Sequence, residues 1–293
     1  MARRTGRWGR LRHPVSAFYR WQSQWEDASD GARTGWTVTV QLVALGFHAR
    51  DPSELARFWA HALRWRAPQT NSLGVELRPT DATSFGVLFL PGARAKDCQN
   101  RIHFDLTTTS VDDQKGTVSE LLAIGAQRID IGQDPNDSHV VLADPEGNEL
   151  CVIGPDNRFL ASCPRLGAVN CDGTRALGYF FSEALAWPLV WDQDEETAIQ
   201  APGGTGPKLT WSGPPLMAKP AKERLHFHVG PTTGSSVDAA LGHLRAIGAT
   251  RVDPDHACRG AIALADVDGN DFCLVDPSVP GGSVSRTTGP QRS

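Results

Sequence analysis

The chain has 293 residues, a formal net charge of −4 and 40% hydrophobic residues. This length gives room for about two domains, each with a core of its own. The slight negative charge excludes a general electrostatic attraction to nucleic acid or acidic membranes, so we expect neither as a partner. No apolar run approaches the roughly 18 residues of a membrane helix, and the N-terminus lacks the apolar core of a secretory signal.

Cysteine usage indicates the compartment. The six cysteines form no Cys-x-x-Cys pair and no even ladder in a small chain, which argues against a zinc knuckle and against a disulfide framework. A reducing cytoplasm is the simpler expectation. The six are Cys98, Cys151, Cys163, Cys171, Cys258 and Cys273.

The first segment, residues 1–38, differs from the rest because arginines alternate with aromatic residues. Two interpretations are open: a basic amphipathic arm for a membrane surface or nucleic acid, and a disordered extension. We expect the disordered extension, since such arms usually carry more lysine and a cleaner helical stripe.

The chain then begins its regular structure with a predicted strand at residues 41–48. Asp51 and Pro52 follow, a capping residue and a proline that favour a helix start. Apolar residues recur at helical spacing from Leu55 to Leu63, which predicts a helix with one buried face. Gly125 is suited to end a second helix. That helix is predicted at 112–124, with further strands at 74–78, 85–90, 101–107, 127–131 and 139–143.

A hairpin motif that occurs twice organises the chain. The stretch ADPEGNELCVI at 143–153 returns as ADVDGNDFCLV at 265–275. In both copies Asp-x-x-Gly-Asn predicts a tight turn between two strands, with glycine at positive φ. Upstream, RIHF at 101–104 matches RLHF at 224–227 at nearly the same offset. Matched blocks at a nearly constant offset indicate that a whole domain was duplicated.

We therefore divide the chain into two copies of one domain. The first covers residues 39–155 and the second 165–277, with a proline-bracketed linker at 156–164. We expect residues 278–293, rich in Gly, Ser, Pro and Thr, to be a disordered tail. The second copy repeats the order of the first, with a strand from residue 166, helices at 174–185 and 237–247, and strands that include 207–211 and the one around His226.

Alternation along the strands predicts which side chains face away from the helices, because successive side chains point to opposite faces. The apolar residues of the two middle strands must lie under the helices, so the polar residues between them face the other way. Structural roles stay open, since a strand histidine or cysteine can serve packing alone. The polar residues expected on one concave surface in each copy are Arg101, His103, Asp105, Glu149 and Cys151, and Arg224, His226, His228, Asp271 and Cys273.

These features resemble glyoxalase-like domains of the vicinal oxygen chelate superfamily, over about residues 40–155 and 165–277. The resemblance rests on the element order, the Gly-Ala after the second helix, the RIHFDL strand and the closing DPEGNELC motif. It implies an α+β fold of two tandem domains, each a pair of βαβββ modules whose mixed sheet forms a cup, with helices outside. Members include glyoxalase I, extradiol dioxygenases, fosfomycin-modifying enzymes, epimerases and bleomycin-binding resistance proteins, so chemistry does not follow from the fold.

Metal-using members take their ligands from four strand positions. The third position is held here by His103 and His226, and the last, usually Glu, by Cys151 and Cys273. The other two fall on apolar residues: Ala44 and Leu166 for the first, and the neighbourhood of Phe89 and Trp211 for the remaining one. A catalytic divalent ion needs about three protein ligands. The resemblance therefore implies cups without the usual metal site, and makes His103, Cys151, His226 and Cys273 the candidates should a divalent metal bind.

The leading hypothesis is a cytoplasmic, metal-independent protein whose two cups bind small organic molecules, with lyase- or isomerase-type chemistry. His103 and His226 would act as polar anchors or acid/base groups. Arg101 and Arg224 would hold an anionic group of the substrate.

Two other functions are open. One is a metal-dependent lyase, isomerase or dioxygenase in which His48, Asp105 or His228 completes the ligand set. The other is a non-catalytic protein that sequesters a drug or metabolite. Because superfamily members often dimerise through such domains, we also expect a pseudo-dimer within one chain that is a monomer in solution.

Overall fold

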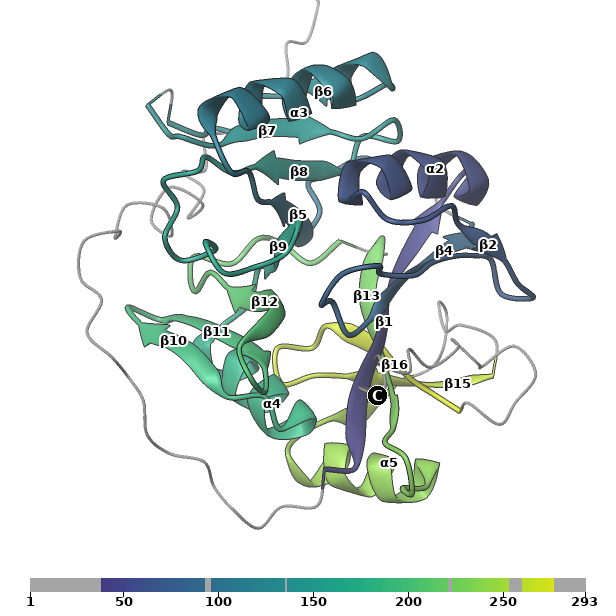
Figure 1. Ribbon diagram of the computed structural model, residues 1–293. Coiled ribbons are helices and arrows are strands. Elements are labelled where there is room, and N and C mark those ends of the chain that lie inside the picture. The colour runs from purple at the N-terminus through teal and green to yellow at the C-terminus, as the bar shows by residue number, and fades with distance from the viewer. Residues whose placement is uncertain (1–37, 93–95, 135, 221–222, 253–259, 277–293) are drawn as a thin grey trace, which may run out of the picture.

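The computed structural model describes residues 38–92, 96–134, 136–220, 223–252 and 260–276 (Figure 1). The expected N-terminal extension, apart from its last residue, and the expected tail lie outside this part of the chain. The described residues form two eight-stranded mixed sheets and four helices. None of these four helices is both long enough and apolar enough to cross a membrane.

Each quarter of the chain folds as one βαβββ module. The first contains β1 (Val40–Ala49), α2 (Pro52–Leu63), β2 (Gln69–Thr70), β3 (Val75–Leu77) and β4 (Gly86–Pro91). The second contains β5 (Ile102–Leu106), α3 (Val111–Ala123), β6 (Gln127–Arg128), β7 (Val140–Ala143) and β8 (Glu149–Val152). The third contains β9 (Leu166–Cys171), α4 (Arg175–Leu185), β10 (Leu189–Gln193), β11 (Glu196–Ala201) and β12 (Thr205–Trp211). The fourth contains β13 (Leu225–Pro231), α5 (Val237–Ala246), β14 (Thr250–Arg251), β15 (Ala261–Ala265) and β16 (Asp271–Val275).

The modules share their sheets across the two halves of the sequence. Sheet A has the order β14-β15-β16-β13-β1-β4-β3-β2 and joins the first module to the fourth. Sheet B has the order β10-β11-β12-β9-β5-β8-β7-β6 and joins the second to the third. The joining pairs, β1 with β13 and β5 with β9, are antiparallel. Figure 1 shows the purple β1 beside the green β13.

The expected α+β class with two cup-like sheets is confirmed, but the partnership of the modules differs from the expectation. The two modules of one sequence copy belong to different sheets, so neither copy forms a cup by itself. The duplication shows which segments are alike. It does not show which first strands pair, because that choice depends on long-range contacts.

An aromatic core on the helix side connects the two modules of each copy. Trp59 of α2 packs edge-on against Phe104 of β5, with ring centroids 4.9 Å apart. Its indole N–H donates to the Asp144 carboxylate at 3.1 Å. In the second copy Phe181 of α4 meets Phe227 of β13 at 5.0 Å. Each copy is therefore held together by side-chain contacts, whereas backbone hydrogen bonds join the copies to each other.

Local signals in the sequence set the ends of several elements. The Asp51 side chain accepts a hydrogen bond from the backbone N–H of Glu54 and caps α2, as predicted. Gly147 and Gly269 have φ of 87° and 77°, which confirms the predicted turns of the repeated motif. The predicted strand at 127–131 is shorter, because β6 ends at Arg128.

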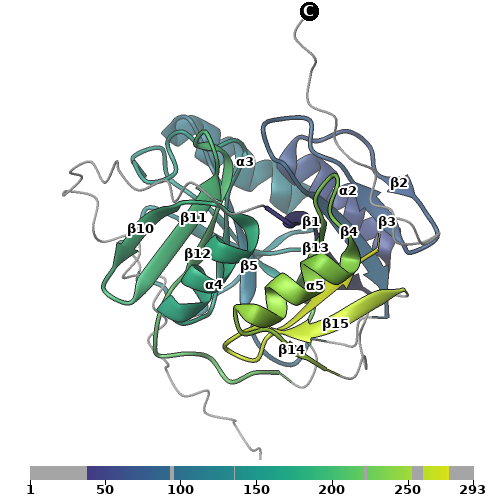
Figure 2. The same cartoon turned by 90° about the horizontal axis from the view of Figure 1, so that it is seen from below.

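The alternation predicted for the middle and closing strands is confirmed. Ile102 and Phe104, like Leu225 and Phe227, belong to the helix-side core. The opposite faces of the two sheets carry separate, smaller apolar clusters. Figure 2 shows α4 and α5 between strands β10–β12 and strands β14–β15 in that view. The polar residues that concern function therefore lie on the two faces turned away from the helices.

Candidate functional site

Two histidines and a cysteine form the polar floor of the sheet-A cup. His226 and His228 lie on β13, and their Nε2 atoms are 2.8 Å apart. Cys273 on β16 is in register with His228. One ligand atom from each of the three residues lies within 4.8 Å of the others, and all three residues are buried. This cluster, the sheet-A triad, contains two of the predicted metal candidates, His226 and Cys273, and the predicted binding residue His228.

Strand β1 from the other sequence copy completes this floor. The His48 ring stacks on His226, with centroids 5.2 Å apart and an interplanar angle of 24°. Gly46 pairs with His226 in the sheet. A Cβ atom at position 46 would lie 2.4 Å from Nε2 of His228 and 2.9 Å from Cε1 of His226. Only glycine leaves room for the two rings, so both copies shape one site.

Burial keeps both histidines of the triad uncharged near neutral pH. Desolvation lowers the pKa of His226 to about 4, although its hydrogen bond with Cys273 acts in the opposite direction. Desolvation, followed by the charge of His48, lowers the pKa of His228 to about 3. A neutral imidazole has one N–H donor and one acceptor nitrogen. The contact between the two Nε2 atoms therefore joins one donor to one acceptor.

Beyond the triad, the same face of sheet A carries an apolar cluster, next to His48 and to the buried Glu76, which pairs with Leu88. Leu88 and Leu90 of β4 pack with Ala44 of β1 and Val275 of β16. An apolar surface with a few convergent polar groups is the usual lining of small-molecule sites.

The sheet-B cup has a related but different floor. His103, Asp105 and Cys151 each place a ligand atom within 4.8 Å of the others. Nε2 of His103 is 3.4 Å from Oδ1 of Asp105. Burial, and then Asp105, raise the pKa of the Cys151 thiol well above its ordinary value. The Cys151 thiol is therefore protonated at neutral pH. His139 is also buried, and desolvation lowers its pKa.

The expected linker lies on this cup. Its residue Leu160 is only 2% exposed and packs with Val141, Cys151 and Ala168 on the face opposite the helices. The segment that the sequence marked as a connection between domains thus covers the floor of the sheet-B cup.

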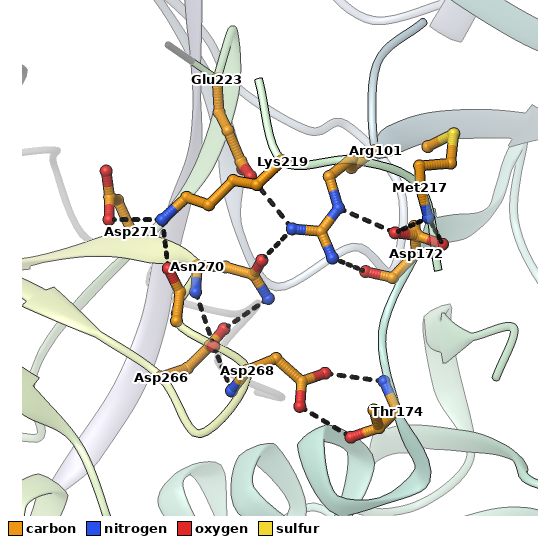
Figure 3. A network of polar contacts seen from close by, with 11 residues as sticks. Arg101, Asp172, Thr174, Met217, Lys219, Glu223, Asp266, Asp268, Asn270 and Asp271 are labelled. Atoms are coloured by element: carbon orange, nitrogen blue, oxygen red, sulfur yellow. Dashed lines mark hydrogen bonds and ion pairs between the residues drawn. The ribbon is translucent and has the colours of Figure 1, made fainter. Parts of the chain in front are cut away.

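The predicted arginine Arg101 lies at a junction between modules (Figure 3). Its Nε donates to Asp172 at 2.8 Å, and its Nη1 donates to Asn270 and lies 3.4 Å from Glu223. A small pocket beside it is lined by Arg101, Asp172, Glu223 and Asn270, among others. Burial raises the pKa of Glu223 to about 7. The Arg101 guanidinium is thus held by protein groups from the third and fourth modules.

Arg224 has a matching position at the other junction. Its Nη1 donates to Asn148 at 3.0 Å and lies 3.6 Å from the Glu146 carboxylate. The two arginines therefore sit at pseudo-equivalent places in the fold. Arg101 bonds to groups of the junction, and the pocket beside it is also lined by His226 of the sheet-A triad.

The predicted carboxylates Glu149 and Asp271 begin the closing strands β8 and β16, and each pairs with a lysine. Glu149 accepts from Lys96 and from the backbone N–H of Asn100. Asp271 accepts from Lys219 at 3.2 Å. Neither carboxylate belongs to the described clusters of metal-type ligands.

Several residues of the two cups did not stand out in the sequence. Gly46 sits in an apolar strand, and nothing in its neighbours predicts that two histidines face it. His139 has no histidine counterpart in the second copy, where Ala261 stands at the matching place. Lys208 of β12 pairs with Ala168 on the sheet-B cup face, and its Nζ donates to the Phe159 carbonyl. It had a usable signal, because a lysine alternating with Leu209 and Trp211 indicates a polar face on that strand.

Comparison with known proteins identifies the family. The model of the glyoxalase-like domain matches residues 41–153 and 168–275. Glyoxalase I from Zea mays is similar in structure, with a TM-score of 0.56, 12% identity, and coverage of 81% of this chain and 92% of that one. Two mutants of the same enzyme give TM-scores of 0.57 and 0.55 at 14% identity, with coverage of 80% and 81% of this chain and 93% and 92% of theirs. A comparison with curated proteins gives no match.

Identity at this level shows the fold alone, whereas the family model matches more than half of the chain in two tandem segments. The chain therefore belongs to the glyoxalase-like domain family of the vicinal oxygen chelate superfamily, with two tandem copies of the domain.

Proposed function

We propose that the sheet-A cup binds a small organic molecule and that the sheet-A triad supplies its polar contacts. The observation behind this proposal is the contact between His226 and His228, two buried neutral imidazoles at 2.8 Å, next to an apolar face. His48 stacks on His226 and is partly exposed, so it lies on the solvent side of the floor. A ligand that enters from this side meets the His48 ring first, with the hydrogen-bonded pair behind it.

The same pair supports acid/base chemistry of the lyase or isomerase type. A neutral imidazole can take a proton from a bound substrate, and its hydrogen-bonded neighbour can share the resulting charge. Because burial lowers the pKa of His226 to about 4, its acceptor nitrogen is free of a proton at neutral pH. The low pKa also makes it a weak base, so we expect substrates whose proton is already acidic, such as those next to a carbonyl group.

The test is a thermal-shift screen of small carbonyl, hydroxy-acid and phenolic compounds, followed by titration of each hit. We expect hits to stabilise the parent chain and His103→Phe, because His103 lies in the other cup. His226→Phe and His228→Phe keep a ring but remove the nitrogens, and we expect at least tenfold weaker binding. Hits that bind both variants as tightly as the parent would exclude this site.

Turnover separates an enzyme from a sequestering protein. If the triad acts as acid and base, His226→Phe loses activity on a bound substrate. If the protein only sequesters the ligand, the parent chain binds it with one fixed stoichiometry and releases it unchanged, which mass spectrometry of the bound compound shows.

A metal-dependent function is the second candidate, because the triad groups three metal-type ligands from two strands. Two imidazoles and one thiolate suit Zn²⁺ or Co²⁺, and the depressed histidine pKa values leave ring nitrogens able to bind. Such an ion would polarise a substrate oxygen. His226, His228 and Cys273 would hold it.

Titration with Co²⁺ tests the metal site. Binding through Cys273 gives a thiolate-to-cobalt absorption band in the near ultraviolet, and we expect Cys273→Ser to lose that band. Saturation at one Co²⁺ per chain, with the band lost in the variant, would favour the metal-dependent function. Absence of the band at millimolar Co²⁺ would argue against it.

We also propose that the protein works in a reducing compartment such as the cytoplasm. Five cysteines in the described part of the chain are free thiols, and three of them, Cys151, Cys171 and Cys273, are buried. Mass spectrometry after alkylation under native and denaturing conditions checks that these thiols stay reduced.

A further inference from the structure

The segment between the two sequence copies packs into the sheet-B cup. Asn157 is buried, and its side chain accepts a hydrogen bond from the backbone N–H of Leu160 at 3.0 Å, which holds the turn. Leu160 enters the apolar cluster on the face of sheet B opposite the helices. Further along, the carbonyl of Pro164 accepts from the Thr107 hydroxyl at 2.8 Å. We call residues 157–163 the cup segment.

Phe159 of the cup segment has contacts that resemble those of a bound ligand. Nζ of Lys208 lies 4.3 Å from the centroid of the Phe159 ring. The same Nζ donates to the Phe159 backbone carbonyl. The edge of Trp191 meets this ring, with centroids 6.0 Å apart and an interplanar angle of 74°. An ammonium over a ring face and an aromatic edge beside it form a slot for an electron-rich aryl group.

The position of Lys208 supports this view. It lies on β12 and is 4% exposed, although a lysine is rarely buried unless its charge is compensated. Its ammonium meets the ring and carbonyl of Phe159 and lies 3.9 Å from the Cys163 sulfur. These compensating groups all come from the cup segment, so the lysine and the segment are matched to each other.

We infer that the sheet-B cup contains an aryl-binding site, formed by Lys208 and Trp191, which the chain fills with its own Phe159. An external aromatic compound with an electron-rich ring would enter this site only in competition with the cup segment. The inference is independent of the function proposed for the sheet-A cup, because it involves the other sheet and none of the sheet-A triad.

Removal of the internal ring tests the inference. Phe159→Ala empties the slot and leaves the backbone carbonyl in place. We expect this variant to bind benzene saturably, followed by NMR through the indole N–H signal of Trp191, whereas the parent chain shows no saturable shift at the same concentrations. A ring-face interaction with an ammonium also predicts roughly two- to five-fold weaker binding of 1,3,5-trifluorobenzene, whose ring face carries little negative charge.

The double variant F159A/K208M is the matched control, since it keeps a side chain of similar length without the charge. We expect it to bind benzene and trifluorobenzene equally. Should Phe159→Ala fail to fold, Phe159→Leu replaces it, with the same preference at lower affinity. The inference would be overturned if the parent chain responded to benzene as Phe159→Ala does, or if neither Phe159 variant gave a saturable response. It would also be overturned if the preference for benzene over trifluorobenzene persisted without Lys208. Loss of ligand binding at the sheet-A cup would leave the inference about the sheet-B cup unaffected.

Discussion

Gly46 lies where the rings of His226 and His228 need space. A methyl group at this position would overlap Nε2 of His228, which is 2.4 Å from the ideal Cβ position. We expect Gly46→Ala to lower the free energy of unfolding by about 1–3 kcal/mol, as for other overpacked sites, and to weaken ligand binding at the sheet-A cup. Urea unfolding and the thermal-shift titration measure the two effects.

Gly242 of α5 provides the control for this substitution. A Cβ atom there meets nothing within 4 Å, and the residue lies inside a helix. Gly242→Ala should therefore stabilise the chain by about 0.5–1 kcal/mol. Equal effects of the two substitutions would mean that the histidine rings can move aside.

The buried histidines also predict how stability depends on pH. The folded pKa values of His226 and His228, about 4 and about 3, lie below the ordinary value of 6.5. At pH values between the folded and the ordinary pKa, the unfolded chain therefore binds more protons than the folded chain. The contribution of these neutral rings to the free energy of unfolding is complete above pH 6.5 and is lost as the pH falls toward 4. Asp144 and Asp266, whose pKa burial raises to about 6, act in the opposite direction.

We therefore expect His228→Phe to lose less stability than the parent chain between pH 7 and pH 4.5. Urea unfolding at several pH values measures the difference, and the two aspartates cancel because both chains contain them. Identical profiles for His228→Phe and the parent would show that His228 is solvated.

At the scale of elements, Arg101 connects three modules from the start of β5. The ion pair with Asp172 is almost fully buried, with 5% and 4% of the two side chains exposed. Removing one partner of a buried pair leaves an uncompensated charge. We expect Arg101→Met to lower the free energy of unfolding by about 3–5 kcal/mol, measured by urea unfolding.

An exposed pair of the same chemistry gives the comparison. Arg175 and Asp192 join α4 to β10, with 42% and 28% of the side chains exposed. Solvent screens such a pair, so Arg175→Met should destabilise the chain much less than Arg101→Met does, again measured by urea unfolding. Similar costs at the two sites would contradict the view that Arg101 holds the module junction.

At the scale of the whole molecule, the pairing of modules makes each half of the chain dependent on the other. A half alone leaves the strands β1 and β5 without their partners β13 and β9. Unpaired edge strands favour association. We expect residues 39–155 and 165–277, expressed separately, to dimerise or aggregate, and to form a folded one-to-one complex when expressed together.

Size-exclusion chromatography and circular dichroism of the separate and combined halves measure this outcome. Two stable monomeric halves would contradict the pairing across sheets. For the intact chain, whose junctions are already filled internally, we propose a monomer with a light-scattering mass near 31.7 kDa. A mass of twice that value would instead show a true dimer.

The sequence by itself determined the repetition of one domain, the turns with glycine at positive φ, and which face of the middle and closing strands is apolar. These properties follow from local periodicity and turn chemistry, which need no knowledge of distant contacts. On the same basis His103 and Cys151, and His226 and Cys273, were expected on shared faces, and the structure places each pair within one cluster.

Only the tertiary structure decided which modules share a sheet, and therefore that His48 and Gly46 of the first copy meet His226 of the second. It also decided that Arg101 lies at a module junction and that the segment between the copies enters the sheet-B cup. The physical reason is the same in each case. Strand pairing and the burial of a connecting segment depend on contacts between residues far apart in the chain, and a repeated pattern is compatible with more than one way to satisfy them.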